Sequence, residues 1–267
     1  VAALDRLRGR GMVDAGTLAC EPAILDETLG GDRAARAAVD MALLDLEGKR
    51  RGLALGALLG IAAPSFPLTF YTIGIAAPEV MLRKAREAGD FPLLKVKVGF
   101  HGDVEVVESI RNETGKRIVV DVNGGWSLRQ ARDKIARLAA CGVEMVEQPV
   151  SATDLDGLRA LRELRLLPIV ADESVAGPED VRRLRDCVDG INVKLAKCGG
   201  VRPALRTMHE ARALGMKVLL GCRIESSLAC TAAAHLCALA DWVDLDGPAL
   251  IGNDPFEGMA IEHGRIR

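Results

Sequence analysis

The sequence lacks the short signals that mark several common classes of protein. None of its seven cysteines stands in a CxxC pair, and its four histidines form no HxH or HExxH pattern. This disfavours a zinc site or a disulfide framework and is typical of a cytoplasmic protein with reduced, mostly buried thiols. No stretch approaches the roughly 18 uncharged apolar residues of a transmembrane helix. The formal net charge of -2 argues against binding to nucleic acid.

What is present is a regular alternation of two kinds of segment. The 267 residues are 49% hydrophobic, enough for a sizeable core. β-rich runs predict strands at residues 68–74, 93–99, 117–123, 143–149, 168–174, 191–197, 217–224 and 242–248. Amphipathic stretches between them predict helices, for example over 127–142 and 179–190. This alternation predicts an α/β protein with a parallel sheet.

The first 60 residues differ, because they predict helix without strand. Apolar residues recur there at helical spacing, at Ala35, Val39, Leu43 and Leu46. Gly52 then follows as a stop signal, and the Pro-rich residues 63–68 predict a boundary. The chain begins at Val1 inside a predicted helix, so we expect a further N-terminal segment to precede it.

Polar residues stand near the ends of the predicted strands at a regular spacing. Successive intervals of 24, 26, 25 and 22 residues separate Lys97, Asp121, Glu147, Asp172 and Lys194. A βα unit repeated at this period is what a closed barrel requires. The alternative, an open doubly wound sheet, often has a Gly-rich phosphate loop after its first strand. The first predicted strand ends in TIGIAAPE, without GxGxxG, so we favour the barrel.

In a βα barrel the ends of the strands gather at one face, where active sites lie. The sequence therefore predicts one cavity lined by Lys95, Lys97, Asp121, Glu147, Asp172 and Lys194. Taken singly, an acid at a strand end often caps a helix, and a lysine often reaches solvent. Six such residues at matching positions are hard to attribute to capping. Three carboxylates without histidine or thiolate suit a hard cation, Mg²⁺ first and Mn²⁺ second.

The lysines indicate the kind of chemistry. Lys95 and Lys97 are two residues apart on a strand and so share one face. We expect their repulsion, together with partial desolvation, to lower the pKa of one of them, as enzymes do when they tune lysine to roughly 7–8. With Lys194 across the cavity, two bases would face one metal that stabilises an enediolate. Racemisation, epimerisation, β-elimination and cycloisomerisation all stay open on this evidence.

In their order and spacing, the segments KVK, DVN, EQP, ADES and NVKLAKCGG resemble the enolase superfamily, muconate lactonizing enzyme subgroup. The resemblance runs from about Ala34 to Asp254. It implies a (β/α)7β TIM-like barrel with an α+β capping domain contributed by both ends of the chain. We accordingly expect residues 1–64 to be the helical remainder of the cap, 65–250 the barrel, and 251–267 a return to the cap. Homo-oligomers are common among such proteins, and we expect one here.

The resemblance also implies roles for the lysines. Lys97, the second lysine of KVK, and Lys194, the first of KLAK, would be opposing acid/base groups. Lys95 would meet the substrate carboxylate and tune its neighbour. We interpret Lys197 as structural.

For the acids, the resemblance implies that the metal is held by Asp121, Glu147 and Asp172. Asn123 and Glu173 would support these groups from behind. The simpler alternatives for these two are a turn residue and a surface acid.

The eighth predicted strand, VDLDGP, separates activities within the subgroup. Asp244 and Asp246 are at i and i+2, so their carboxylates face the same way. This DxD pair is similar to that of dipeptide epimerases, in which it binds the free α-ammonium of the dipeptide. A helix N-cap plus a turn acid is the simpler alternative.

The seventh predicted strand, GCRIESS, is similar to the GxxxE stretch of the epimerases, which implies that Cys222 and Ile224 line the substrate. Arg223 departs from the apolar residue expected there. It either points away between helices or alters which side chain the second residue of the dipeptide can carry. Thr72 is a weaker candidate for the wall of the substrate site.

Together these features predict a Mg²⁺-dependent isomerase, a dipeptide epimerase of the L-Ala-D/L-Glu type that exchanges the α-proton of the C-terminal residue. The alternative enzyme is a muconate-type cycloisomerase or o-succinylbenzoate synthase using the same centre. A hypothesis of a different class is a non-catalytic, truncated barrel acting as a binding module. We expect a small dipeptide as the partner, and neither nucleic acid nor membrane.

Overall fold

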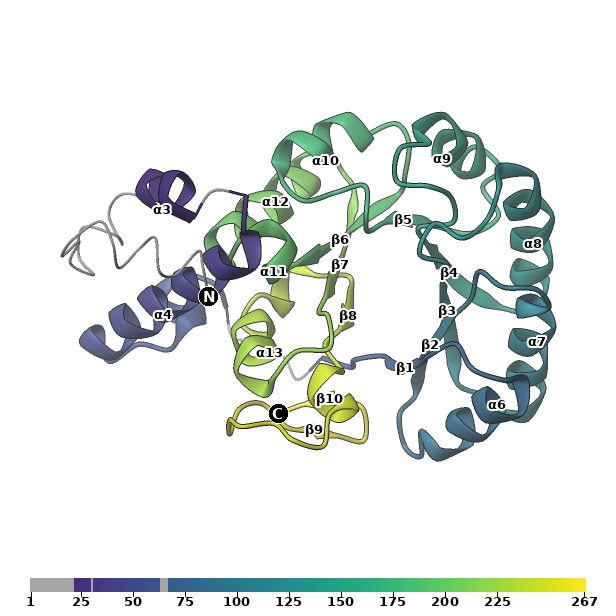
Figure 1. The fold of residues 1–267 in the computed structure, drawn as a ribbon, viewed down its shortest axis with the longest axis horizontal. Helices are drawn as coiled ribbons and strands as arrows, with labels where there is room; N and C mark the ends of the chain where they lie inside the picture. Colours follow the sequence, from purple (N-terminus) through teal and green to yellow (C-terminus); the bar gives the residue numbers. More distant parts are fainter. Residues whose placement is uncertain (1–21, 30, 63–66) are drawn as a thin grey trace.

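Eight short strands run parallel and pair in sequence order in the computed structural model of the protein, which describes residues 22–29, 31–62 and 67–267 (Figure 1). They are β1 (Tyr71–Ile73), β2 (Leu93–Lys97), β3 (Arg117–Asp121), β4 (Val143–Glu147), β5 (Ile169–Ala171), β6 (Gly190–Lys194), β7 (Lys217–Gly221) and β8 (Trp242–Asp244). Seven of the eight predicted runs contain one of these strands, and the run over 191–197 overlaps β6, which begins one residue earlier. The run over 191–197 is strand only as far as Lys194, because a short helix begins at the next residue.

Helices follow the strands and form the outer layer of the barrel (Figure 1). They are α6 (Pro78–Glu87), α7 (Asp103–Glu113), α8 (Leu128–Ala140), α9 (Leu155–Arg162), α10 (Pro178–Leu184), α11 (Leu195–Cys198), α12 (Val201–Ala213) and α13 (Ser227–Ala234), with 3-10 turns η1 (Cys237–Leu239) and η2 (Gly247–Leu250). The predicted TIM-like barrel is therefore confirmed. None of the helices in the described ranges is long and apolar enough to cross a membrane.

The first and last strands close the ring through a few hydrogen bonds. The amide of Phe70 donates to the carbonyl oxygen of Val243 at 3.1 Å. One residue earlier, the buried Thr69 hydroxyl accepts from the amide of Leu245 at 2.8 Å. These bonds bring β8 beside β1, so the ends of all eight strands face one central space.

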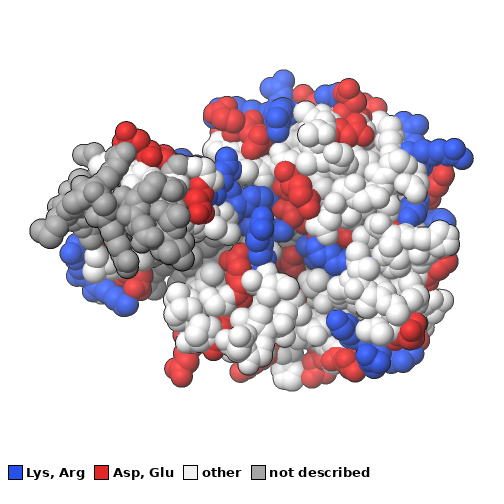
Figure 2. Space-filling view, viewed as in Figure 1, with Lys and Arg blue, Asp and Glu red and all other residues white. Residues whose placement is uncertain are grey.

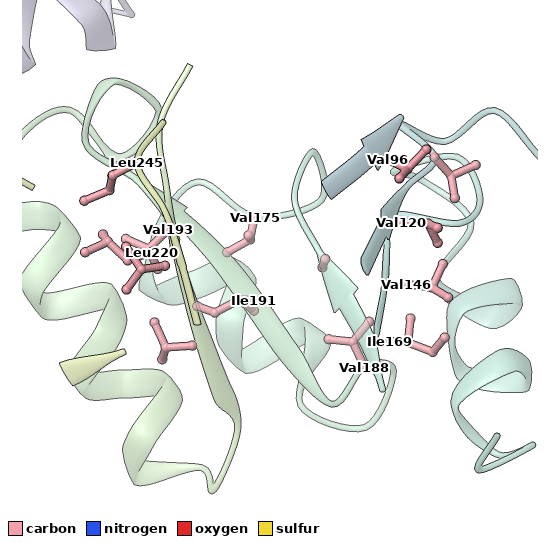
Figure 3. Packing of buried hydrophobic residues seen from close by; sticks show 14 of the residues in the cluster. Val96, Val120, Val146, Ile169, Val175, Val188, Ile191, Val193, Leu220 and Leu245 are labelled. Atoms are coloured by element: carbon pink, nitrogen blue, oxygen red, sulfur yellow. The ribbon is translucent and has the colours of Figure 1, made fainter. Parts of the chain in front are cut away.

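Alternation along the strands divides the core into two layers. Outward-facing residues such as Val96, Val120 and Ile191 pack between strands and helices in the larger cluster (Figure 3). Inward-facing residues form a separate apolar plug inside the barrel: Phe70, Leu93, Val119, Met145, Val170 and Leu219. Two residues further along β2–β5 the inward side chain is charged instead, namely Lys95, Asp121, Glu147 and Asp172. The apolar plug is thus the floor beneath a charged layer.

A small helical cap lies against one side of the barrel (Figure 1). It consists of α3 (Pro22–Leu29), α4 (Arg33–Arg51) and α5 (Leu55–Leu58). The helix predicted around Ala35 and Leu46 is α4, and Gly52 ends it with φ 65°, as the stop signal predicts. The predicted helix within residues 1–21 and the Pro-rich residues 63–66 lie outside the described part of the chain.

Two buried charged residues fasten α4 to the barrel. Arg36 donates to the carbonyl oxygen of Gly199 at 2.6 Å, and the Asp40 carboxylate accepts from the amide of Val201 at 2.7 Å. Gly200 has φ 130°, and a Cβ there would lie 2.6 Å from Asp40. The cap therefore holds the segment that directly follows β6 and α11.

The C-terminal residues form a hairpin of β9 (Ile261–Glu262) and β10 (Arg265–Ile266). The amide of Ile266 donates to the carbonyl oxygen of Pro67 at 3.1 Å, and that of Thr69 donates to Gly264 at 2.8 Å. These two hydrogen bonds join residues 251–267, which we assigned to the cap, to the segment that leads into β1.

Candidate active site

A cavity of about 810 Å³ opens at the carboxyl ends of the strands, where charged side chains of both signs gather in the hollow of the molecule (Figure 2). Most of the predicted site residues line it: Thr72, Lys95, Lys97, Asn123, Asp172, Glu173, Lys194, Cys222, Ile224, Asp244 and Asp246. Asp121 and Glu147 are fully buried just beneath it. The structure thus brings all thirteen predicted residues to one end of the barrel.

Lys95 lies at the centre of the charged layer and is 3% exposed. Its Nζ is 3.1 Å from Asp121 Oδ2, 2.8 Å from Glu147 Oε2 and 2.7 Å from Asp244 Oδ2. Burial alone would lower the Lys95 pKa, but the three carboxylates outweigh burial and raise it well above the usual value. Lys95 is therefore not the lysine with the lowered pKa that we expected of one of the two.

Lys97 lies nearer the mouth of the cavity, and its side chain is 26% exposed. Its Nζ donates to Asp121 Oδ2 at 2.6 Å and to Asn123 Oδ1 at 2.8 Å. Asn123 in turn donates through Nδ2 to Glu173 Oε1 at 2.9 Å. This chain of contacts orients the Lys97 ammonium, and it gives both predicted supporting residues a place beside it.

Lys194 approaches from the other side of the cavity. Its Nζ donates to Asp172 Oδ2 at 2.6 Å. Burial would lower the Lys194 pKa, but Asp172 and Glu147 raise it above its usual value. Lys197 contacts the second oxygen of Asp172, and it also donates to the carbonyl oxygen of Asn192 at 2.8 Å. Burial would raise the Asp172 pKa, but Lys197 and Lys194 hold it well below its usual range.

The three predicted metal ligands, Asp121, Glu147 and Asp172, come from neighbouring strands. As the side chains stand, no three acidic, histidine or cysteine side chains of the described residues converge closely enough to hold a metal ion, because lysines pair with the acids. The chemistry of the acids nevertheless fits a hard divalent cation. Burial and the charge of Asp121 raise the Glu147 pKa to about 7, so the lysines do not fully compensate this acid. A cation bound here would supply the missing charge.

Asp244 and Asp246 stand on the side of the cavity opposite Glu147. Asp246 Oδ2 accepts from the amide of Thr72 at 2.7 Å, which places Thr72 beside the pair. Asp244 Oδ1 is buried without a hydrogen-bond donor among the described residues. Burial and the charge of Asp244 raise the Asp246 pKa to about 7. This pair, like Glu147, has more negative charge than its neighbours compensate.

The end of β7 forms another wall. Ile224 is 70% exposed although it is apolar, and it lines the cavity. Cys222 lies between the cavity and the interior, where its contact with Cys230, together with burial, raises its pKa well above the usual value. Arg223 also lines the cavity. It therefore does not point away between helices, which was the first of our two interpretations of this residue.

Some residues of the site were missed by sequence reasoning. Asn192 is fully buried, and its Nδ2 donates to Glu147 Oε1 at 2.6 Å. A Cβ at Gly221 would clash with the Asn192 side chain, so glycine there leaves room for it. The signal was available, because Asn192 is two residues before Lys194 and must share its face.

Gln148 was missed as well. It follows Glu147 with φ 38°, and its Oε1 accepts from the amide of Asp172 at 2.9 Å. It therefore fixes the end of β5 relative to the end of β4. The signal was available, because Gln148 is the middle residue of the EQP segment, to which we assigned only the role of Glu147.

The fold and the site define a βα-barrel protein with a charged centre at the carboxyl ends of its strands. Residues 79–249 match the family model described as enolase C-terminal domain-like. Residues 14–60 match the mandelate racemase / muconate lactonizing enzyme N-terminal domain. The chain therefore belongs to the enolase superfamily, as the resemblance of its motifs implied.

Named relatives within the superfamily are dipeptide epimerases. The chain is 44% identical over 237 residues to the L-Ala-D/L-Glu epimerase of Bacteroides thetaiotaomicron, covering 88% of this chain and 62% of the relative. It is 39% identical over 242 residues to the hydrophobic dipeptide epimerase of Roseobacter litoralis, covering 86% and 69%. The chain thus spans about three fifths to two thirds of the length of these relatives.

Solved structures give the same picture. The dipeptide epimerase of Cytophaga hutchinsonii, complexed with Mg and D-Ala-L-Val, superposes with a TM-score of 0.89 at 31% identity, covering 96% of this chain and 73% of that one. A muconate lactonizing enzyme superposes with a TM-score of 0.88 at 28% identity, covering 95% and 74%. The fold is thus common to enzymes with different named activities, and the site must distinguish them.

Proposed function

We propose that this chain carries the catalytic centre of a dipeptide epimerase, which removes the α-proton of the C-terminal residue and returns a proton to the opposite face. The observation that carries the proposal is the placement of charged groups on four strands. Lys97 ends β2, Lys194 ends β6, Glu147 ends β4 and Asp244 ends β8. In a ring of eight strands β2 faces β6 and β4 faces β8. The two axes cross at roughly a right angle.

The first axis is the axis of proton transfer. Lys97 ends β2 and Lys194 ends β6, so the two ammonium groups approach the cavity from opposite sides. Each is anchored by one carboxylate, Asp121 for the former and Asp172 for the latter. An α-carbon held between them presents one face to each lysine, which is the arrangement that inversion requires.

The second axis orients the ends of the substrate. Glu147 and its neighbouring buried acids lie around β4, where the carboxylate of a dipeptide would be held, and Lys95 reaches from β2 to the centre, between these acids and Asp244. Asp244 and Asp246 lie at β8, where the α-ammonium would compensate the excess negative charge of the pair. A substrate with an anionic end and a cationic end fits this axis. The relatives named as dipeptide epimerases support the same assignment.

Asp121, Glu147 and Asp172 are the residues that would hold Mg²⁺, or Mn²⁺ in its place. Such an ion, when bound, stabilises the negative charge that develops on the substrate carboxylate. Asn192 orients Glu147, and Lys197 and Gln148 orient Asp172. Lys95, whose pKa the three neighbouring carboxylates raise, adds a positive charge beside these acids.

Exchange in D₂O with Mg²⁺ and a dipeptide library tests the proposal. We expect deuterium at the α-carbon of the C-terminal residue, with inversion. Replacing Lys97 or Lys194 by Met should abolish inversion while leaving exchange of the one epimer that the remaining lysine faces. Lys49→Met, on the exposed surface of α4, is the matched control. Absence of exchange with every dipeptide, together with turnover of a succinylcyclohexene carboxylate, would instead show an o-succinylbenzoate synthase.

A further inference from the structure

Two cations at the mouth of the cavity have no role in the site described so far. They are Arg223, which follows β7, and Lys84, on α6. Both are exposed, and both line the same cavity as the charged layer. Every other lysine of the cavity is ion-paired, since Lys95, Lys97, Lys194 and Lys197 each lie within 3.1 Å of a carboxylate.

Arg223 and Lys84 differ from those lysines because neither forms an ion pair with a carboxylate of the described residues. Glu225 is the nearest acid to Arg223 in sequence, but its Oε1 accepts from the main-chain amide of Arg223 at 2.9 Å. The nearest acid after Lys84 is Glu87, which pairs with Arg83 at 3.6 Å. Both cationic groups are therefore available to a ligand that enters the cavity.

The backbone that carries Arg223 is held firmly. The amide of Cys222 donates to the carbonyl oxygen of Asp244 at 3.0 Å. Gly247 packs so closely against this loop that a Cβ there would lie 3.0 Å from the Arg223 carbonyl oxygen and 2.9 Å from that of Glu225. The loop is thus fixed to β8, the strand that carries the proposed ammonium site.

The geometry of the two axes fixes where the substrate side chain goes. Around the α-carbon, the direction of proton transfer is taken by Lys97 and Lys194. The carboxylate points toward β4 and the nitrogen toward β8. In the plane that contains the carboxylate and the nitrogen, one direction remains for the substrate side chain. It runs out of the barrel toward its mouth, where Arg223, Lys84 and the exposed Ile224 are found.

We therefore infer that Arg223, assisted by Lys84, selects dipeptides whose epimerised residue carries an acidic side chain. This inference rests on the proposed dipeptide epimerase function and adds the chemical class of its substrate. The side-chain carboxylate meets the guanidinium of Arg223, while its methylene groups pass Ile224. Relatives of the chain are named for acidic and for hydrophobic dipeptides, so membership of the family does not decide the class.

The experiment compares Ala-Glu with its neutral isostere Ala-Gln as substrates of the protein with Mg²⁺. We expect kcat/KM for Ala-Glu to exceed that for Ala-Gln by roughly tenfold or more, as a hydrogen bond to a charged group provides. Arg223→Met should lower kcat/KM for Ala-Glu at least about tenfold more than for Ala-Gln, chiefly through KM. Lys84→Met should act in the same direction with a smaller effect.

Charge reversal and a matched control complete the test. Arg223→Glu should turn the preference from Ala-Glu toward Ala-Lys. Arg132→Met, on the exposed surface of α8 and away from the cavity, should leave kcat/KM for Ala-Glu and for Ala-Gln unchanged. Arg223 is exposed, so its replacement leaves the fold intact, and thermal unfolding of each variant checks this.

The failures of the two proposals are distinguishable. Exchange with no dipeptide at all overturns the epimerase function itself. Epimerisation of Ala-Gln as fast as Ala-Glu, or an unchanged preference in Arg223→Met, overturns only the role of Arg223. A preference for Glu-Ala over Ala-Glu places the carboxylate on the first residue and overturns the assignment to the epimerised one.

Discussion

Replacing Asp246 by Asn should stabilise the fold at alkaline pH while it impairs the site. Asp246 is 3% exposed, and its Oδ2 accepts from the amide of Thr72. Burial and the neighbouring Asp244 raise its pKa from 3.8 to about 7. Between about pH 4 and pH 7 the folded protein therefore keeps a proton that the unfolded chain has lost. Its stability consequently falls as the pH rises through this window.

The size of the effect follows from the same pKa. A rise from 3.8 to about 7 corresponds to roughly 4 kcal/mol of lost stability at pH values above 7. Between pH 5 and pH 8 the change is about 2 to 3 kcal/mol. Asn keeps an oxygen that can accept from Thr72 but carries no charge. We therefore expect Asp246→Asn to gain about 2 kcal/mol more over the unmodified protein at pH 8 than at pH 5.

Urea denaturation at the two pH values, without dipeptide, measures this difference. Asp133→Asn, at an exposed acid on α8, is the control, and its stability should differ from that of the unmodified protein by the same amount at pH 5 and at pH 8. The same Asp246 variant should lose at least about a hundredfold in dipeptide turnover while retaining metal binding. If it is destabilised equally at both pH values, the reasoning about its burial is refuted. Equal loss of dipeptide turnover and metal binding would contradict the ammonium role.

Three further changes test how the acids are held. Asn192→Ala removes the 2.6 Å bond to Glu147, so titration with Mg²⁺ should show roughly 10- to 100-fold weaker binding. Gly221→Ala should also weaken the binding of Mg²⁺, although residue 221 does not contact the ion, because the new Cβ displaces Asn192. An unchanged affinity for Mg²⁺ would refute the role of Asn192 in orienting Glu147. Lys197→Met should destabilise the protein by about 1–3 kcal/mol at pH 7, measured by urea denaturation. Because the Asp172 pKa is depressed in the folded protein, the loss of stability caused by Lys197→Met should become smaller as the pH falls below about 4. A loss of stability that grows at low pH would contradict the pairing of Lys197 with Asp172.

The barrel could be predicted from the sequence because its signals are local and periodic. The strand that carries Lys97 and the strand that carries Asp121 each combine aliphatic or β-branched residues with a charged residue at the last position. A spacing of 22 to 26 residues then leaves room for one helix and two turns. The same alternation placed Asp244 and Asp246 on one side of the cavity. Nothing beyond strand geometry and the βα repeat was needed for these placements.

What could not be predicted depends on contacts between distant segments. Arg36 and Asp40 lie in a helix whose apolar spacing indicated a different face, the one that packs Val39 and Leu43 against α3. They are buried because they bind the residues after Cys198, more than 150 positions away. Amphipathic periodicity identifies an apolar face, but it has no means of identifying a buried polar one. The cap therefore joins the segment that follows Lys194 through groups that the pattern would place in solvent.

The paired lysines of β2 show why a shared face does not mean a shared environment. Successive inward residues of a strand differ in depth by about 7 Å. Lys95 thereby reaches the layer of Asp121, Glu147 and Asp244, whereas Lys97 lies one layer nearer the mouth, between Asp121 and Asn123. At the deeper level burial lowers the Lys95 pKa, but the three carboxylates outweigh it and raise that pKa. Lys95 holds the acids of the charged layer together, and in the proposed function Lys97 exchanges the proton above it, so one strand supplies both lysines.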